Sequence, residues 1–67
     1  MTGEELRKFR ARAGLTQRQL GELLGYEGRT AEVMVQMWEY GKRPINPKHY
    51  RKLCKLLNIT FDDLIPE

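Results

Sequence analysis

Few side chains in this sequence are suited to catalysis or metal binding. His49 is the single histidine and stands beside charged residues in a predicted helix, which favours an exposed side chain over a catalytic one. Asp62 and Asp63 are better explained as stabilisers of the N-terminal dipole of a last helix. Cys54 is the single cysteine, which excludes an intramolecular disulfide, and no group of Cys and His has metal-ligand spacing. We therefore expect no enzyme, no metal site and no cofactor.

Other side chains are suited to contact with phosphate groups. Thr16, Gln17 and Arg18 open a predicted helix, where free backbone N–H groups and the helix dipole favour an anion. Lys42 and Arg43 follow the next predicted helix and either bind a second phosphate or stay solvated. Lys and Arg number 12 against 9 acidic residues, and the net charge of +3 favours polyanionic partners. A further basic group is interpreted as the solvent face of a later helix; it comprises Lys48, Arg51, Lys52 and Lys55.

Capping residues in the sequence predict where the helices begin. Thr2 and Thr16 are each followed three residues later by Glu or Gln, which is the pattern of a capping box. Thr30 is the best available cap for a third helix, and Asn46 stands before a proline at a first helical position. Thr60 then caps a short last helix. The expected helices cover residues 3–13 and residues 17–24, with a third from the Thr30 cap to about Tyr40, one more after Asn46-Pro47 and the last one after Thr60.

The length and the patterning bound the fold. A chain of 67 residues is expected to form one domain over residues 1–67, with marginal stability. No strand pattern is present, so we expect an all-α protein of four or five helices. The N-terminus has no apolar core for a signal peptide, and no run approaches the roughly 20 apolar residues that span a bilayer, so we expect a cytoplasmic protein without membrane contact. The predicted core comprises Leu6, Phe9, Leu20, Leu24, Val35, Trp38 and Leu53.

The segment from Leu15 to Gly41 has the spacing of two helices folded across a tight corner. Leu20 lies on the apolar stripe of the first of these helices, and Gly25 ends that helix. Val35 and Trp38 are one turn apart on the second helix and must both face inward. The outer face of the second helix is then free to enter a DNA major groove.

These residues resemble the phage lambda repressor-like helix-turn-helix family, which is of Cro/C1 type and is also called the XRE family. The likeness covers nearly the whole chain and is carried by Leu6-Arg7, Ala13-Gly14-Leu15-Thr16-Gln17, Leu20-Gly21-Glu22-Leu23-Leu24-Gly25 and Trp38-Glu39-Tyr40-Gly41-Lys42-Arg43. It implies a compact four- to five-helix DNA-binding domain. In size the chain is similar to small phage or mobile-element regulators, anti-CRISPR-associated repressors among them.

Two packing features are implied by the resemblance. Gly21 stands where the family usually has alanine, at the closest approach of two helices, and either residue keeps the side chain at the crossing small. Arg10 and Glu39 are expected to form a partly buried ion pair between the first and third helices. The alternative for these two residues is a pair of solvated surface charges.

The chain departs from the family between the turn glycine and the tryptophan. Ordinary members have a shorter interval, whereas 13 positions separate Gly25 from Trp38 here, so roughly one helical turn has been inserted. The added residues lie within positions 26–31. Either the turn is longer or the third helix gains a turn at its N-terminus, and both outcomes alter the side chains that meet the bases.

Aligned backwards from Trp38, the family's base-reading positions fall on Glu32, Val33, Gln36 and Met37. Gln36 can read adenine, Glu32 can accept a hydrogen bond from cytosine N4, and Arg29 can contact guanine if the longer corner aims it into the groove. We therefore expect base reading by these three residues and Val33. The apolar side chains of this helix, Met34 and Met37 included, fit a place in the core equally well.

The residues and the resemblance together predict a sequence-specific regulator of transcription that binds double-stranded DNA. The expected form is a homodimeric repressor on a palindromic operator, with autorepression, since no sensor domain or small-molecule ligand is evident. The candidate dimer contacts, each of which could instead complete the core of the monomer, are Tyr50, Phe61, Leu64 and Ile65. The alternative function is a protein-binding module that uses the apolar side chains of the third helix, such as a phage inhibitor of a host enzyme.

Overall fold

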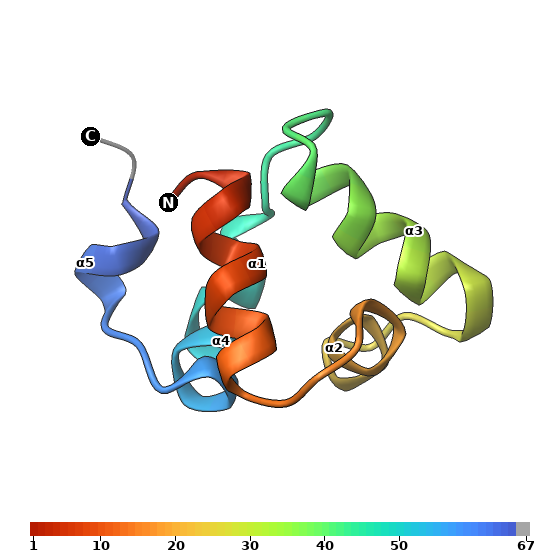
Figure 1. The fold of residues 1–67 in the computed structure, drawn as a ribbon, viewed down its shortest axis with the longest axis horizontal. Helices are drawn as coiled ribbons and strands as arrows, with labels where there is room; N and C mark the ends of the chain where they lie inside the picture. Colours follow the sequence, from red (N-terminus) through yellow and green to blue (C-terminus); the bar gives the residue numbers. More distant parts are fainter. Residues whose placement is uncertain (66–67) are drawn as a thin grey trace.

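Most helices begin at a side chain that satisfies their free N–H groups. In the computed structural model, which describes residues 1–65, Thr2 accepts a hydrogen bond from the backbone N–H of Glu5, and the Glu5 carboxylate accepts one from the N–H of Thr2. Thr16 and Gln19 form the same reciprocal pair. The helices are α1 (Gly3–Arg12), α2 (Gln17–Leu23), α3 (Gly28–Glu39), α4 (Tyr50–Leu57) and α5 (Phe61–Leu64), with a 3₁₀ turn at Pro47–His49 (Figure 1). None of residues 1–65 lies in a strand, and the all-α prediction is confirmed.

The third helix begins earlier than the sequence predicts. α3 starts at Gly28, after Glu27, whose side chain makes no capping hydrogen bond. Thr30 lies inside the helix, so the prediction that it caps α3 is wrong. The connection from α2 to α3 is short, and Gly25 within it has a φ of 106°, a left-handed value that favours glycine. α3 therefore extends further at its N-terminus than the sequence predicts, and the corner stays tight.

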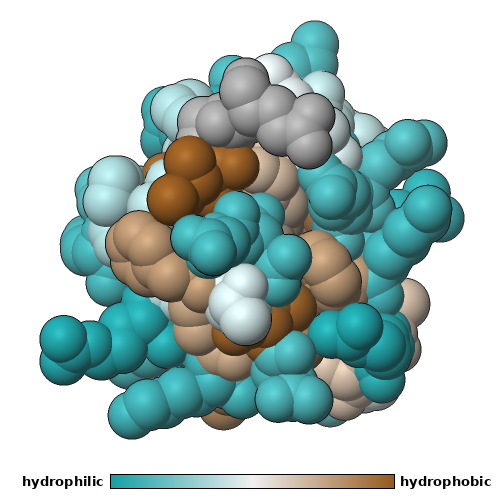
Figure 2. Space-filling view, turned by 90° about the vertical axis from the view of Figure 1, so that its left-hand side faces the viewer, coloured by the Kyte–Doolittle hydropathy of each residue, from teal (hydrophilic) through white to brown (hydrophobic). Residues whose placement is uncertain are grey.

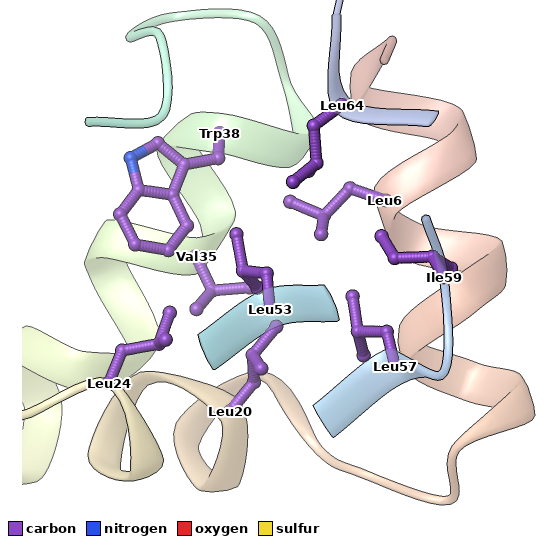
Figure 3. Packing of buried hydrophobic residues seen from close by; sticks show 9 residues of the cluster. All are labelled: Leu6, Leu20, Leu24, Val35, Trp38, Leu53, Leu57, Ile59 and Leu64. Carbon is purple, nitrogen blue, oxygen red and sulfur yellow. The ribbon is translucent and has the colours of Figure 1, made fainter. Parts of the chain in front are cut away.

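The apolar core lies where the four longer helices meet. Leu53 of α4 is surrounded by Leu6 of α1, Leu20 of α2 and Val35 of α3, and all four side chains are fully buried (Figure 3). Trp38 is the largest buried side chain and is 3% exposed. The other buried members of the core are Leu24, Leu57, Ile59 and Leu64. Phe9, which the sequence analysis places in the core, is only partly buried and packs against its edge.

α2 and α3 cross at Gly21, where the backbones leave no room for a side chain. A Cβ atom on Gly21 would overlap the carbonyl oxygen of Ala31 and lie 2.6 Å from its carbonyl carbon and 2.7 Å from its Cα. Both residues are buried. Ala31 lies near the start of α3, and at this crossing the backbone of one helix packs against the backbone of the other. At this crossing there is no room even for the methyl group of alanine, the residue that the family usually has at this position.

His49 is buried, which corrects the expectation of an exposed side chain. It is 5% exposed, and its Nε2 atom lies 2.9 Å from the hydroxyl oxygen of Tyr26. Its ring centroid lies 5.6 Å from that of Trp38. Burial, and then the positive charges of Lys48 and Lys52, hold the pKa of His49 below its ordinary value of 6.5. A neutral imidazole thus ties the corner after α2 to the start of α4.

α3 and α5 lie at opposite ends of the molecule, whose longest dimension is 30 Å (Figure 1). The N-terminal ammonium group lies 3.4 Å from the carbonyl oxygens of Leu64 and Ile65, which holds the start of the chain beside α5. Among the described residues, no helix combines the length and the apolar character that crossing a membrane requires.

Candidate nucleic-acid interface

α3 has a buried face and an opposite face that is open to solvent. Ala31, Val35 and Trp38 recur at helical spacing and are buried against the rest of the fold. The opposite side, which we call the outer face of α3, consists of Arg29, Thr30, Val33, Gln36, Met37 and the adjoining Tyr40. Arg29, Thr30 and Tyr40 are exposed, and the other three side chains are partly exposed. A convex, solvent-accessible helix face of this kind has the shape that a DNA major groove admits.

The apolar residues of α3 divide between the core and the outer face. Met34 packs against the core, whereas Val33 and Met37 belong neither to the core cluster nor to the hydrophobic residues packed against it. Glu32 is partly buried and lies at the edge of the outer face. Tyr40 is 70% exposed and was not singled out by the sequence analysis, although its seven-residue spacing from Val33 places both on one side of the helix.

A chain of polar side chains supports the outer face from beneath. Arg10 Nε lies 2.6 Å from Glu39 Oε2, Arg10 Nη2 lies 3.2 Å from Glu39 Oε1, and the side chain of Glu39 is 3% exposed. Arg10 also donates to the carbonyl oxygen of Leu15 at 2.9 Å. Gln17 Nε2 donates to Glu39 Oε1 at 3.1 Å, and Gln36 Nε2 donates to Gln17 Oε1 at 3.2 Å. The chain therefore runs from α1 through the end of α3 and the start of α2 to the outer face.

The negative charge of Glu39 fixes the direction of the hydrogen bonds in this series of side chains. A carboxylate can only accept, so Glu39 turns the NH₂ group of Gln17 towards itself. The carbonyl oxygen of Gln17 then faces Gln36 and accepts from its NH₂ group. Within residues 1–65, the second N–H of the Gln36 amide and its carbonyl oxygen make no hydrogen bond, and these two groups together match the N7 acceptor and N6 donor of adenine. The relation between Gln17 and Gln36 depends on how α2 crosses α3, and the sequence analysis missed it.

The predicted phosphate ligands lie at the start of α2 and just after the end of α3. Thr16 and Arg18 are exposed at the start of α2, and the ion pair of Arg18 with Glu22 is long, at 3.7 Å, and exposed. The amide group of Gln17 is engaged inside the protein, so its backbone N–H is the part left for a phosphate. Lys42 and Arg43 are exposed directly after α3. Because Gln17 bonds to Glu39, the start of α2 lies beside the end of α3 that carries these two cations.

Two of the four candidate dimer residues, Phe61 and Ile65, are exposed at the α5 end of the molecule, away from α3. Phe61 is 57% exposed and Ile65 is 50% exposed, and Figure 2 looks onto this end, where apolar residues reach the surface among hydrophilic ones. Tyr50 is partly buried and stacks edge-on against Phe61, with ring centroids 5.7 Å apart. Leu64 is 3% exposed and belongs to the core, so it is corrected from a dimer candidate to a core residue.

The remaining charged residues indicate no further site. The basic residues of the 3₁₀ turn and α4, which are Lys48, Arg51, Lys52 and Lys55, are exposed, as expected for a solvent face. Within residues 1–65, no three His, Cys, Asp or Glu side chains are placed to hold a metal ion together.

Comparison with known protein families finds one whose model includes the α2–α3 corner. A family model described as helix-turn-helix matches residues 6–64 of the chain. The matched segment runs from α1 to the end of α5 and so includes the whole corner and the outer face of α3. No curated protein and no solved structure matches the chain.

Proposed function

The chain belongs to the Cro/C1-type helix-turn-helix family of DNA-binding regulators, and on this premise we propose that it is a homodimeric repressor of a palindromic operator. The observation that carries the proposal is the outer face of α3, which is open to solvent while a buried ion pair and two amides hold it in place. Repression follows if the bound protein blocks the promoter that overlaps its operator. The proposal includes no separate sensing site, so the concentration of the protein sets the occupancy of the operator, as in autorepression.

Base reading in this proposal comes from four residues of α3. Gln36 binds adenine with its free carbonyl oxygen and N–H, and Arg29 at the N-terminal end of the helix binds guanine O6 and N7. Glu32 accepts from cytosine N4, and Val33 contacts a thymine methyl group. The early start of α3 supports the role of Arg29, because that residue stands on a helical turn and not in a loose loop.

Phosphate contacts orient the helix in the groove. The backbone N–H groups at the start of α2, with Thr16 and Arg18, bind one phosphate, and Lys42 and Arg43 bind another. All of these donors except the half-buried Gln17 are on exposed residues. These contacts supply affinity that depends on salt, and they do not discriminate between sequences.

The dimension of the molecule supports dimerisation through the α5 end. Half-sites one helical turn apart place two recognition helices about 34 Å from each other, so each α3 would lie about 17 Å from the two-fold axis. The molecule is 30 Å long with α3 and α5 at opposite ends, so an axis beside Phe61 and Ile65 places α3 at about that distance or farther, which fits half-sites one helical turn apart or more. Two copies would then present both helices to one side of the DNA.

The test compares the loss of a base contact with the loss of a phosphate contact. We expect Gln36→Ala to weaken binding to the selected duplex by about 5- to 150-fold while leaving random duplex unchanged, because a base contact carries about 1–3 kcal/mol of discrimination. Arg43→Ala should weaken binding to both duplexes and lower the salt slope by about one unit. Lys55→Ala, the matched control on the exposed side of α4, should do neither. Equal losses on both duplexes for Gln36→Ala would remove that residue from the readers, and binding that does not depend on salt would contradict DNA as the partner.

A further inference from the structure

We propose that the outer face of α3 reads the C5-methyl groups of thymines, so that each half-site contains two thymines contacted by Val33 and Met37. The inference rests on the proposed function and adds to the chemistry of the target: a duplex recognised through two neighbouring methyl groups as well as through hydrogen bonds. Val33 alone was expected to touch a base, whereas here two apolar side chains act together.

The first observation is that, within residues 1–65, these two side chains belong neither to the apolar core nor to the hydrophobic residues packed against it. Val33 and Met37 are partly exposed and lie outside both the core and the hydrophobic residues packed on it, although Met34 on the same helix does pack there. The two stand four residues apart and so lie one above the other on the outer face. The middle of the outer face therefore presents hydrocarbon, flanked by Gln36 and with Arg29 at one end.

The second step concerns which bases an apolar side chain can distinguish in a major groove. Thymine is the one ordinary base that shows a methyl group there, whereas cytosine shows an N–H donor and the purines show acceptors. An apolar side chain against one of those polar edges removes it from water without replacing its hydrogen bond, which is unfavourable. Against a thymine methyl group the same side chain buries apolar surface on both partners.

The helix geometry restricts where the two thymines can lie. Residues four apart are separated by about 6 Å along the axis of an α-helix. Successive base pairs are about 3.4 Å apart along a DNA strand. If α3 lies along the groove, the two methyl groups are expected within about two base-pair steps of each other. Gln36, between them in sequence, would meet its adenine in the same short stretch.

Removal of single methyl groups from the DNA tests this inference. On the duplex that the protein enriches from a random pool, each thymine is replaced in turn by deoxyuridine, which lacks only the C5-methyl group, and the dissociation constant is measured by fluorescence anisotropy. We expect about a fourfold loss of affinity at each of two neighbouring positions of a half-site, as for one buried methyl group, and no change elsewhere.

Protein variants then assign each methyl group to a side chain. Val33→Ser should abolish the effect of deoxyuridine at one of the two positions, and Met37→Gln, which keeps the length of the side chain, should abolish it at the other. Leu23→Ala is the matched control, because Leu23 is an exposed apolar residue of α2, 47% exposed, and should leave both effects intact. Circular dichroism of each variant is the control that checks whether it remains helical.

The outcomes separate this inference from the function on which it rests. Deoxyuridine effects within 1.5-fold at every position, on a duplex still bound specifically, would overturn methyl reading and leave the DNA-binding function standing. Fourfold effects that persist in both variants would overturn the assignment to Val33 and Met37. If the random pool yields no enriched duplex, the proposed function fails, and methyl reading fails with it.

Discussion

The substitution Gly21→Ala should destabilise this protein, although the same change in the middle of most helices is stabilising. Gly21 lies inside α2, where alanine is favoured over glycine by about 1 kcal/mol from helix propensity alone. Its Cβ position, however, is 2.6 Å from the carbonyl carbon of Ala31 and 2.7 Å from its Cα. The sign of the effect therefore depends on whether backbone contact or helix propensity dominates.

The magnitude follows from the amount of overlap. Carbon atoms pack best at about 3.5–4.0 Å, so α2 and α3 would have to separate by about 1 Å. Because the opposing atoms belong to the backbone, no change of rotamer relieves the contact. Overpacking of this kind costs about 1–3 kcal/mol, and the gap would also loosen Leu20 and Leu24 on the same helix. The gain in helix propensity of about 1 kcal/mol reduces this cost to about 0–2 kcal/mol, and the loosened packing of Leu20 and Leu24 adds to it, so we expect Gly21→Ala to lower the free energy of unfolding by about 1–2 kcal/mol.

Urea unfolding followed by the fluorescence of Trp38 measures this change. Ala11→Gly, at an exposed position of α1, is the control that gives the helix-propensity effect in this chain, and we expect it to destabilise by up to about 1 kcal/mol. A Gly21→Ala variant as stable as the wild type, or more stable, would refute the close crossing of α2 and α3. The effect would be large for a 67-residue protein, whose total stability is expected to be roughly 3–10 kcal/mol.

Three further results are expected. Glu39→Gln should lower the free energy of unfolding by about 3 kcal/mol, because it leaves the Arg10 guanidinium unpaired, whereas Arg18→Gln at an exposed pair should change it by less than about 1 kcal/mol; equal small effects in urea unfolding would contradict a buried pair. The pKa of His49 is lowered on folding, so the unfolded chain binds its proton more readily, and stability should fall as the pH drops below 6.5. His49→Phe should remove this pH dependence, which urea unfolding at several pH values measures. If the free energy of unfolding of the variant and of the wild type changed with pH in parallel, His49 would not be its source. Phe61→Ser should weaken dimerisation in sedimentation experiments, and an unchanged dimer would move the interface away from α5.

Helix starts were predictable from the sequence wherever a side chain makes the cap. Thr2 and Thr16 each stand three residues before a Glu or Gln that completes a capping box, and both helices begin where these pairs indicate. α3 has no such signal, because Glu27 makes no side-chain cap, and the nearest good capping residue, Thr30, was chosen in error. The start of α3 is decided by packing, since Ala31 must lie against Gly21.

The candidate site was predictable as a set of residues and less so as an arrangement. The family pattern indicated Gln36 and Gln17 separately, but their hydrogen bond depends on the crossing of two helices and has no signature in sequence. His49 was misjudged for a related reason. Its charged neighbours suggest a solvent face, whereas the 3₁₀ turn before α4 directs its ring towards Tyr26 and Trp38.

The most direct test of the central claim, sequence-specific DNA binding through the outer face of α3, is selection of bound duplexes from a random pool. We expect enrichment of an inverted repeat whose half-sites are centred about one helical turn apart, with an altered preference when Gln36 is replaced by alanine. A pool that remains random after repeated selection, or an enriched sequence that Gln36→Ala and Arg29→Ala leave unchanged, would contradict the account.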